Sequence, residues 1–220
     1  MKKYIVTAVG LMILLGLSAC AERRVVGSGV MTTETRDVHG FREVSLSGVG
    51  ALTIQHGDQE SLVIEGEDNI VSIIETEVVG ERLTIGFDRP ATVIPTKALR
   101  YRLTVVNLSG IDLSGAGSIV AYGINTDRLE VTVSGAGSLT VAGEADHQNV
   151  LLSGVGSYHA EGLITNTAVV EVSGAGSATI QVNEHLEVNV SGAGSVHYLG
   201  DPTVESNVTG LGSVKKIGGD

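Results

Sequence analysis

Ser114-Gly115-Ala116-Gly117-Ser118 is the stretch of sequence that decides the fold, because it returns four more times almost unchanged. The pentapeptide Ser-Gly-Ala/Val-Gly-Ser also stands at 134–138, 153–157, 173–177 and 191–195, with variants at 47–51 and 209–213. From Ser114 onward the starts are 20, 19, 20, 18 and 18 residues apart. A unit of about 19 residues is too short for a helix pair and is typical of one coil of a solenoid.

Apolar and polar residues alternate with a period of two on both sides of each pentapeptide, as in Leu129, Val131 and Val133 upstream and Leu139 and Val141 downstream. This pattern predicts two short strands in each coil, with one face turned inward. So short a coil can bury that face only against the next coil. The sequence therefore predicts an all-β fold, a single-stranded parallel β-helix (β-solenoid) with about 19-residue coils and Ser-Gly-Ala-Gly-Ser corners. A sandwich of antiparallel hairpins is the alternative.

The glycines of the pentapeptide are expected at the corners, where a residue without Cβ lets the chain bend sharply or adopt a positive φ. The predicted structural corners are Ser47, Gly48, Gly50, Ser114, Gly115, Gly117, Ser134, Gly135, Gly137, Ser153, Gly154, Gly156, Ser173, Gly174, Gly176, Ser191, Gly192, Gly194, Gly210 and Gly212.

The start of the chain has the three zones of a secretory signal: Lys2 and Lys3, an apolar run over 4–17, and small residues before Cys20. Leu17-Ser18-Ala19-Cys20 resembles the lipobox of bacterial lipoproteins, in which the cysteine is acylated. Cys20 is the only cysteine of the chain, so no disulfide can form within it. These features predict lipidation of Cys20 and a lipid-anchored protein of the cell envelope, on the outer membrane, with the periplasmic or surface face left open.

Four segments follow from these patterns: a signal peptide at 1–19, a lipid-anchored tether at 20–26, irregular β coils at 27–110 and regular repeats at 111–220. The last two are expected to form one continuous domain. Within the irregular half, the segments around Val44, 52–54, 62–64 and 83–85 are expected to be strands. The segment 88–99 contains Pro90 and Pro95, so it is expected to be a loop.

The charge argues against nucleic acid as a partner. The net charge is −11, and loss of Lys2 and Lys3 with the signal peptide makes it −13. An acidic surface repels phosphate, so contact with a membrane should come through the lipid anchor. Aromatic residues make up only 3% of the chain, which predicts a thin aliphatic core.

A carbohydrate-active enzyme, a glycan hydrolase or lyase on a β-helix scaffold, is the alternative to a binding role. A lyase needs basic residues, yet Arg128 is the only Lys or Arg between Arg102 and Lys215. A hydrolase needs two carboxylates, and Glu187 and Glu205 take the same position in adjacent coils. Acids of the irregular half, such as Asp58, Glu65, Glu67 and Asp68, would have to converge in a cleft.

No cofactor or metal site is predicted. His159 and His197 share one position but lie two coils apart, about 10 Å, whereas zinc ligands lie about 2.1 Å from one ion. No Gly-x-Gly is followed by the third Gly or the Lys of nucleotide-binding loops.

A binding surface is the remaining class of function. Outward positions after the corners include Thr140, His159, Thr179 and His197, and the strand before the corner carries Glu171, Asn189 and Asn207 outward. Such a flat polar face suits weak, repeated contacts with a glycan or a cell-surface protein, although ordinary solvated sheet residues give the same pattern.

Several residues together resemble the head GIN domain family, also described as auto-transporter adhesins. They are Gly27-Ser28-Gly29, Arg36, Gly40-Phe41, Val44, Ser47-Gly48-Val49-Gly50, Gly57-Asp58 and the serial corners, so the resemblance covers about 27–214. It implies a β-helical envelope protein and supplies no catalytic residues. The resulting hypothesis is an envelope-anchored lipoprotein whose β-solenoid head binds surfaces in an adhesive or structural role without catalysis.

Overall fold

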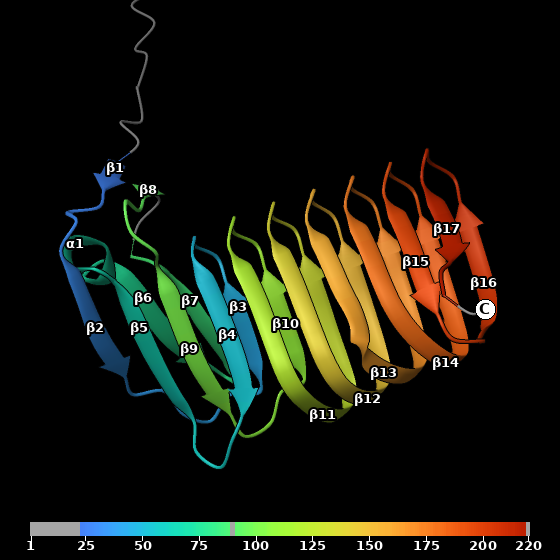
Figure 1. Ribbon diagram of the computed structural model, residues 1–220, viewed down its shortest axis with the longest axis horizontal. Coiled ribbons are helices and arrows are strands. Elements are labelled where there is room, and N and C mark those ends of the chain that lie inside the picture. Colours follow the sequence, from blue (N-terminus) through green and yellow to red (C-terminus); the bar gives the residue numbers. More distant parts are fainter. Residues whose placement is uncertain (1–22, 89–90, 219–220) are drawn as a thin grey trace, which may run out of the picture.

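The computed structural model describes residues 23–88 and 91–218 and shows a parallel β-solenoid (Figure 1). The all-β class and the coil repeat are confirmed. The strands are β1 (Arg23–Val26), β2 (Met31–Arg36), β3 (Glu43–Leu46), β4 (Ala51–His56), β5 (Ser61–Glu67), β6 (Ile74–Val79), β7 (Arg82–Phe87), β8 (Ala91–Ile94), β9 (Arg100–Val105), β10 (Gly110–Leu113), β11 (Ser118–Val133), β12 (Ser138–Leu152), β13 (Ser157–Val172), β14 (Ser177–Val190), β15 (Ser195–Leu199), β16 (Thr203–Val208) and β17 (Ser213–Lys216). A single short helix, α1 (Asp68–Val71), lies among the described residues.

The spacing of the pentapeptides equals the length of the coils. Ser118 pairs with Ser138, Ser138 with Ser157, and Ser157 with Ser177, all in parallel register. The ladder then continues through Ser195 and Ser213. Equivalent residues therefore lie side by side in adjacent coils.

Each regular coil is one long bent strand of 14 to 16 residues, and not the two short strands expected from the sequence. The chain turns in mid-strand, where Gly123 and Gly143 adopt φ values of 69° and 141° and where the register shifts between neighbouring coils. The two halves of these strands form two faces. We call the halves after the corners, with β9, β4, β15 and β17, the front sheet, and the halves before the corners, with β7, β3, β10 and β16, the back sheet.

Aliphatic side chains fill the space between the two sheets. On the back sheet Val131, Val150, Val170 and Val188 stand in register and are each at most 3% exposed. In the last coil the same position is Ser206. The alternating pattern of the sequence therefore marks the inward face correctly.

The corner glycines are required by close stacking and not by backbone conformation. Of the predicted corner glycines only Gly50 has a positive φ. A Cβ on Gly135 would lie 1.9 Å from the carbonyl oxygen of Gly115 in the preceding coil, and that oxygen already accepts the N–H of Ala136 at 3.2 Å. The hydrogen-bond ladder thus continues around the corner, where it leaves no room for a side chain.

The irregular half stacks in an order that differs from the order of the chain. β3 lies between β7 and β10, and β4 lies between β9 and β11, so the later coil of β7 and β9 stands on the N-terminal side of β3 and β4. The antiparallel strands β5, β2 and β6 complete that end. The segments expected to be strands around Val44, Leu52, Leu62 and Leu83 are β3, β4, β5 and β7.

Two segments differ from the expected tether and loop. Residues 23–26, within the predicted tether, form β1, and 91–94, within the segment expected to be a loop, form β8. The two strands pair in parallel as a separate small sheet, with Val25 opposite Val93. Val93 is buried and Val25 packs against the core, so this sheet is held to the solenoid by its inner side.

A buried polar chain crosses the core of the regular coils. The Tyr158 hydroxyl donates to Gln148 Oε1 at 3.2 Å, Gln148 Nε2 donates to Thr165 Oγ1 at 2.9 Å, and Thr165 donates to the Gln181 carbonyl at 2.7 Å. All three side chains that make these bonds are at most 1% exposed, and burial raises the pKa of Tyr158 above its ordinary value. The chain links β12, β13 and β14.

We expect Gly135→Val to destabilise the whole stack by about 3 kcal/mol, because its side chain overlaps the backbone of the preceding coil and the coils unfold cooperatively. Ala136→Val is the matched control, since Val155 occupies the equivalent exposed position, and it should change the free energy of unfolding by less than about 0.5 kcal/mol. Urea unfolding of both variants measures the difference, and equal midpoints would contradict the stacking explanation.

Removing the hydroxyl of Tyr158 should leave Gln148 Oε1 buried without a partner and cost about 2 kcal/mol. Adding Gln148→Leu to Tyr158→Phe removes both partners, so the double variant should lose less stability than the sum of the two single variants. Chemical unfolding of the three variants gives the coupling energy. Strict additivity would show that the two side chains act independently.

Candidate functional site

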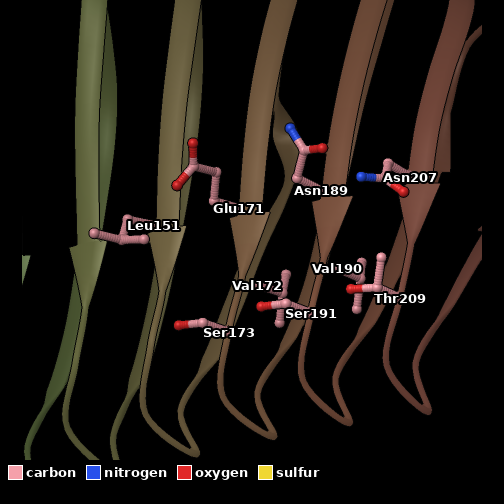
Figure 2. A pocket seen from close by; sticks show the side chains of 9 residues that line it. All are labelled: Leu151, Glu171, Val172, Ser173, Asn189, Val190, Ser191, Asn207 and Thr209. Atoms are coloured by element: carbon pink, nitrogen blue, oxygen red, sulfur yellow. The ribbon is translucent and has the colours of Figure 1, made fainter.

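A shallow groove of about 140 Å³ runs across the back sheet near the corners of the last coils. Its two walls are rows of side chains from successive coils, and Figure 2 shows both rows crossing the strands. One row is Leu151, Glu171, Asn189 and Asn207, which are neighbours in register. The second row is Ser173, Ser191 and Thr209, the first residues of three corners.

The strand alternation explains why these side chains reach the groove. Glu171 and Ser173 flank the buried Val172, and Asn189 and Ser191 flank the buried Val190. Residues two apart in a strand point to the same side, so the buried valines form the floor and their neighbours form the walls.

Most polar groups of the groove have no hydrogen-bond partner among the described residues. Among the described residues only Asn189 uses a side-chain hydrogen bond, which its Nδ2 donates to Glu187 Oε1 at 3.1 Å. Glu171, Asn207, Ser173, Ser191 and Thr209 make no side-chain hydrogen bond to another described residue, so carboxylate, amide and hydroxyl groups are all available to a ligand.

The four residues named as a binding face from the sequence form one continuous row on the front sheet. Thr140, His159, Thr179 and His197 follow each other in register, and Lys215 continues the row. His159 Nδ1 lies 3.7 Å from Glu161 Oε1. Most of the row is half-buried.

The two sheets differ in charge. The outward carboxylates of the strands are concentrated on the back sheet, whereas the front row carries hydroxyls, imidazoles and Lys215. The back-sheet acids are Glu43, Asp112, Glu130, Glu171, Glu187 and Glu205. A ligand of the groove therefore meets a surface that repels anions.

The acids considered for a hydrolase do not share a cleft. Glu187 and Glu205 are neighbours in register, as expected, but both are exposed outside the groove. Glu65 is paired with Arg102 at 3.2 Å, Asp58 is exposed, and Glu67 and Asp68 face separate partners. None of the four acids from the irregular half lines the groove.

His159 and His197 are separated by Thr179 in the ladder, as the spacing predicted. Across residues 23–88 and 91–218 no three His, Cys, Asp or Glu side chains are arranged to hold a metal ion.

Glu67 forms a clasp at the N-terminal end that was not predicted from the sequence. Its side chain is 1% exposed and accepts four hydrogen bonds. The donors are Gly29 N at 2.6 Å, Thr96 Oγ1 at 2.5 Å, Thr96 N at 2.8 Å and Lys97 N at 3.2 Å. One carboxylate thus joins the loop after β1 to the loop after β8.

The clasp has a matching space and an electrostatic signature. Gly27 lies so close to Glu67 that a Cβ there would be 1.9 Å from Oε2. Hydrogen bonds from the Thr96 hydroxyl, and from the backbone of Thr96, Gly29 and Lys97, lower the pKa of Glu67 to about 2, against the opposing effect of burial.

The lowered pKa makes the clasp sensitive to acid. Glu67 binds fewer protons folded than unfolded, so its stabilisation is complete above its ordinary pKa of 4.5 and is lost as the pH falls toward about 2. We expect the amide proton shifts of Gly29, Thr96 and Lys97 to titrate together with a midpoint near 2, and Glu67→Gln to abolish this titration. A midpoint near the ordinary value would contradict the clasp.

Cys20 lies outside the described residues, so its lipidation stays a prediction. Within 23–88 and 91–218 no helix combines the length and apolar character needed to cross a bilayer.

The fold agrees with solved structures of other bacterial proteins. A "putative adhesin" from Bacteroides fragilis is 25% identical, with a TM-score of 0.73 over 88% of this chain and all of that one. "Putative adhesin" structures from Parabacteroides distasonis and Parabacteroides merdae are 21% and 20% identical, each with a TM-score of 0.56, over 88% and 89% of this chain and all of theirs. Among curated proteins no match was found.

The resemblance noted from the corners is confirmed by the match of a family model to residues 40–202, from the Gly40-Phe41 pair to the beginning of the last coil. That family is described as "Putative auto-transporter adhesin, head GIN domain". The match spans most of the chain and includes six of the seven corners, together with β13 and β14 of the groove; β16 lies beyond it. The chain belongs to the head GIN domain family.

Proposed function

We propose that the protein is a lipid-anchored envelope adhesin that binds neutral glycan chains along the groove of the back sheet. The observation that carries this proposal is the pair of polar rows across successive coils, whose hydrogen-bonding groups are largely unused within the protein. Membership of an adhesin family and similarity to the Bacteroides fragilis structure support a binding role.

The chemistry of the groove favours a hydroxyl-rich neutral ligand. Glu171 accepts hydrogen bonds, Asn207 both donates and accepts, and the hydroxyls of Ser173 and Ser191 do either. Glu187 and Glu205 beside the groove disfavour an anionic chain. Because the walls repeat from coil to coil, an extended chain with its own repeat can make the same weak contact several times.

The position of the groove suits a protein held by its N-terminus. The groove lies on β12, β13, β14 and β16, toward the end of the solenoid opposite to β1 (Figure 1). Acyl chains on Cys20 would hold the protein on the envelope, because each methylene buried in the bilayer contributes about 0.8 kcal/mol to membrane binding. The groove would then lie at the end remote from the membrane.

A catalytic role on the same scaffold is less well supported. Glu187 and Glu205 stand side by side on an exposed face, where no wall encloses a sugar ring between them. We therefore place the interaction in binding and assign no catalytic residue.

Asn189→Ala combined with Asn207→Ala should reduce binding of beads that carry the protein at high density to neutral glycans by at least tenfold. Each lost hydrogen bond weakens a contact that many copies repeat, so the effect is multiplied. The measurement is bead retention on immobilised glycans. Thr140→Ala with Thr179→Ala, on the front row, is the matched control and should bind like the wild type.

The same proteins expressed in cells test the location. Intact cells should lose the wild-type protein to added protease, and Cys20→Ala should move it from the membrane to the soluble fraction. Protection of the wild-type protein from protease in intact cells would contradict surface exposure. In the glycan-binding test, equal binding by the groove double variant and the front-row double variant would show that the binding site is not the groove.

A further inference from the structure

Three exposed apolar side chains lie near the N-terminal end, and the groove does not explain them. We define the N-terminal cap as β1, residues 27–30, α1, β8 and residues 95–97. Val26 is 49% exposed, Val30 59% and Met31, which follows the cap, 42%. In Figure 1 β1 and β8 stand away from the stacked coils at this end.

The small sheet of the cap has an inner and an outer face. Val25 and Val93 pack inward, whereas Val26 and Ile94, which pair in register, lie on the opposite face. A two-stranded sheet is marginally stable on its own and gains from cover on both faces. On the outer face of this sheet Val26 is 49% exposed and Ile94 is half-buried.

The sequence places the predicted lipid directly beside this surface. Only Ala21 and Glu22 separate Cys20 from Arg23, the first residue of β1. Even a fully extended chain spans no more than about 10 Å over these three steps. The headgroup layer of one leaflet is about 5–8 Å thick, so a lipidated Cys20 would hold β1 at the level of the headgroups.

The exposed charges of the cap suit that position. Arg24 lies two residues from Val26 on the same outer face, and Lys97 is exposed in the loop that binds Glu67. On a chain of net charge −11 these two cations lie at the end where anionic headgroups would meet them. Asp68, the exposed acid of α1, accepts hydrogen bonds from Ser28 and from the backbone of Asn69.

From these observations we infer that the N-terminal cap rests on the bilayer, with Val26, Val30 and Met31 in the interface and Arg24 and Lys97 at the phosphates. The inference rests on the proposed lipid anchor. Because the Glu67 clasp fixes the cap to the solenoid, this contact holds the head at a set orientation and does not let it swing from a flexible tether.

The test uses the full lipidated protein in vesicles of phosphatidylethanolamine and phosphatidylglycerol. Cys20 is the only cysteine and is consumed by the lipid, so Val30→Cys and Val26→Cys each provide a unique thiol for an environment-sensitive fluorophore. Leu211→Cys, 93% exposed in the last corner, is the matched control. We expect nitroxide-bearing lipids to quench the labels at 26 and 30 several-fold more than the label at 211.

Flotation with the vesicles separates the two levels of the proposal. A protein that does not float, or floats equally as Cys20→Ala, lacks the anchor and overturns the proposed function. A protein that floats but whose labels at 26 and 30 are as open to aqueous iodide as the label at 211 overturns the membrane contact alone. Labels shielded from iodide but not quenched by lipid would show that a second copy of this chain covers the cap, and would overturn the membrane contact too.

Lengthening the tether gives an independent check. A flexible Gly-Ser insertion between Ala21 and Glu22 leaves every described residue unchanged but removes the length restriction. Lipid quenching at 30 should fall toward the value at 211 while flotation is retained. Unchanged quenching would show that the cap binds lipid without help from the short tether.

Discussion

The close approach of successive coils at their corners is the constraint on which the rest of the structure depends. A Cβ on Gly115, Gly135 or Gly174 would lie within about 2 Å of a backbone oxygen of the preceding coil, so these positions accept only glycine. The remaining corner side chains cannot enter the stack and must point outward. The row of Ser173, Ser191 and Thr209 that borders the groove is thus a direct consequence of how tightly the backbone stacks.

A stack of nearly identical coils needs features that define its register and its ends. Tyr158, Gln148 and Thr165 provide the first, because their hydrogen bonds can form only when β12, β13 and β14 are neighbours in that order. At the C-terminal end two inward positions change from apolar to polar: Ser206 follows Val188, and Lys216 follows Tyr198 and lies 2.5 Å from Asp201. Polar groups at an open edge discourage further stacking.

The fold was predictable where the sequence repeats and unpredictable where it does not. Corner spacing gave the coil length because equal positions must pair, and the alternation around Val131 gave the inward face. The placement of β7 and β9 before β3 and β4, and the β1–β8 pair, rest on long-range contacts without a periodic signal.

The site was less predictable than the fold. Nothing in the sequence distinguishes Glu67 from the other acids, because its contacts with Gly29 and Thr96 form only when the chain folds. The polar rows of the groove were visible as outward positions, but the groove between them depends on how the corner leaves the strand. Gln148 offered a weak signal, since Leu129 and Leu186 occupy its position in other coils.

The two ends of the solenoid differ in structure, and this difference suits them to different roles in the proposed function. The N-terminal end is the irregular one, where antiparallel strands, a short helix and the Glu67 clasp join segments far apart in the sequence. In the proposed arrangement these contacts would resist bending at the place where a short lipid tether applies force. The C-terminal coils are regular and carry unused polar groups in rows. A rigid connection between them matters for weak repeated binding, because the effective concentration of each contact depends on how little the others let it move. A head that swung freely would lose much of that advantage, so in the proposed function the clasp and the groove act together.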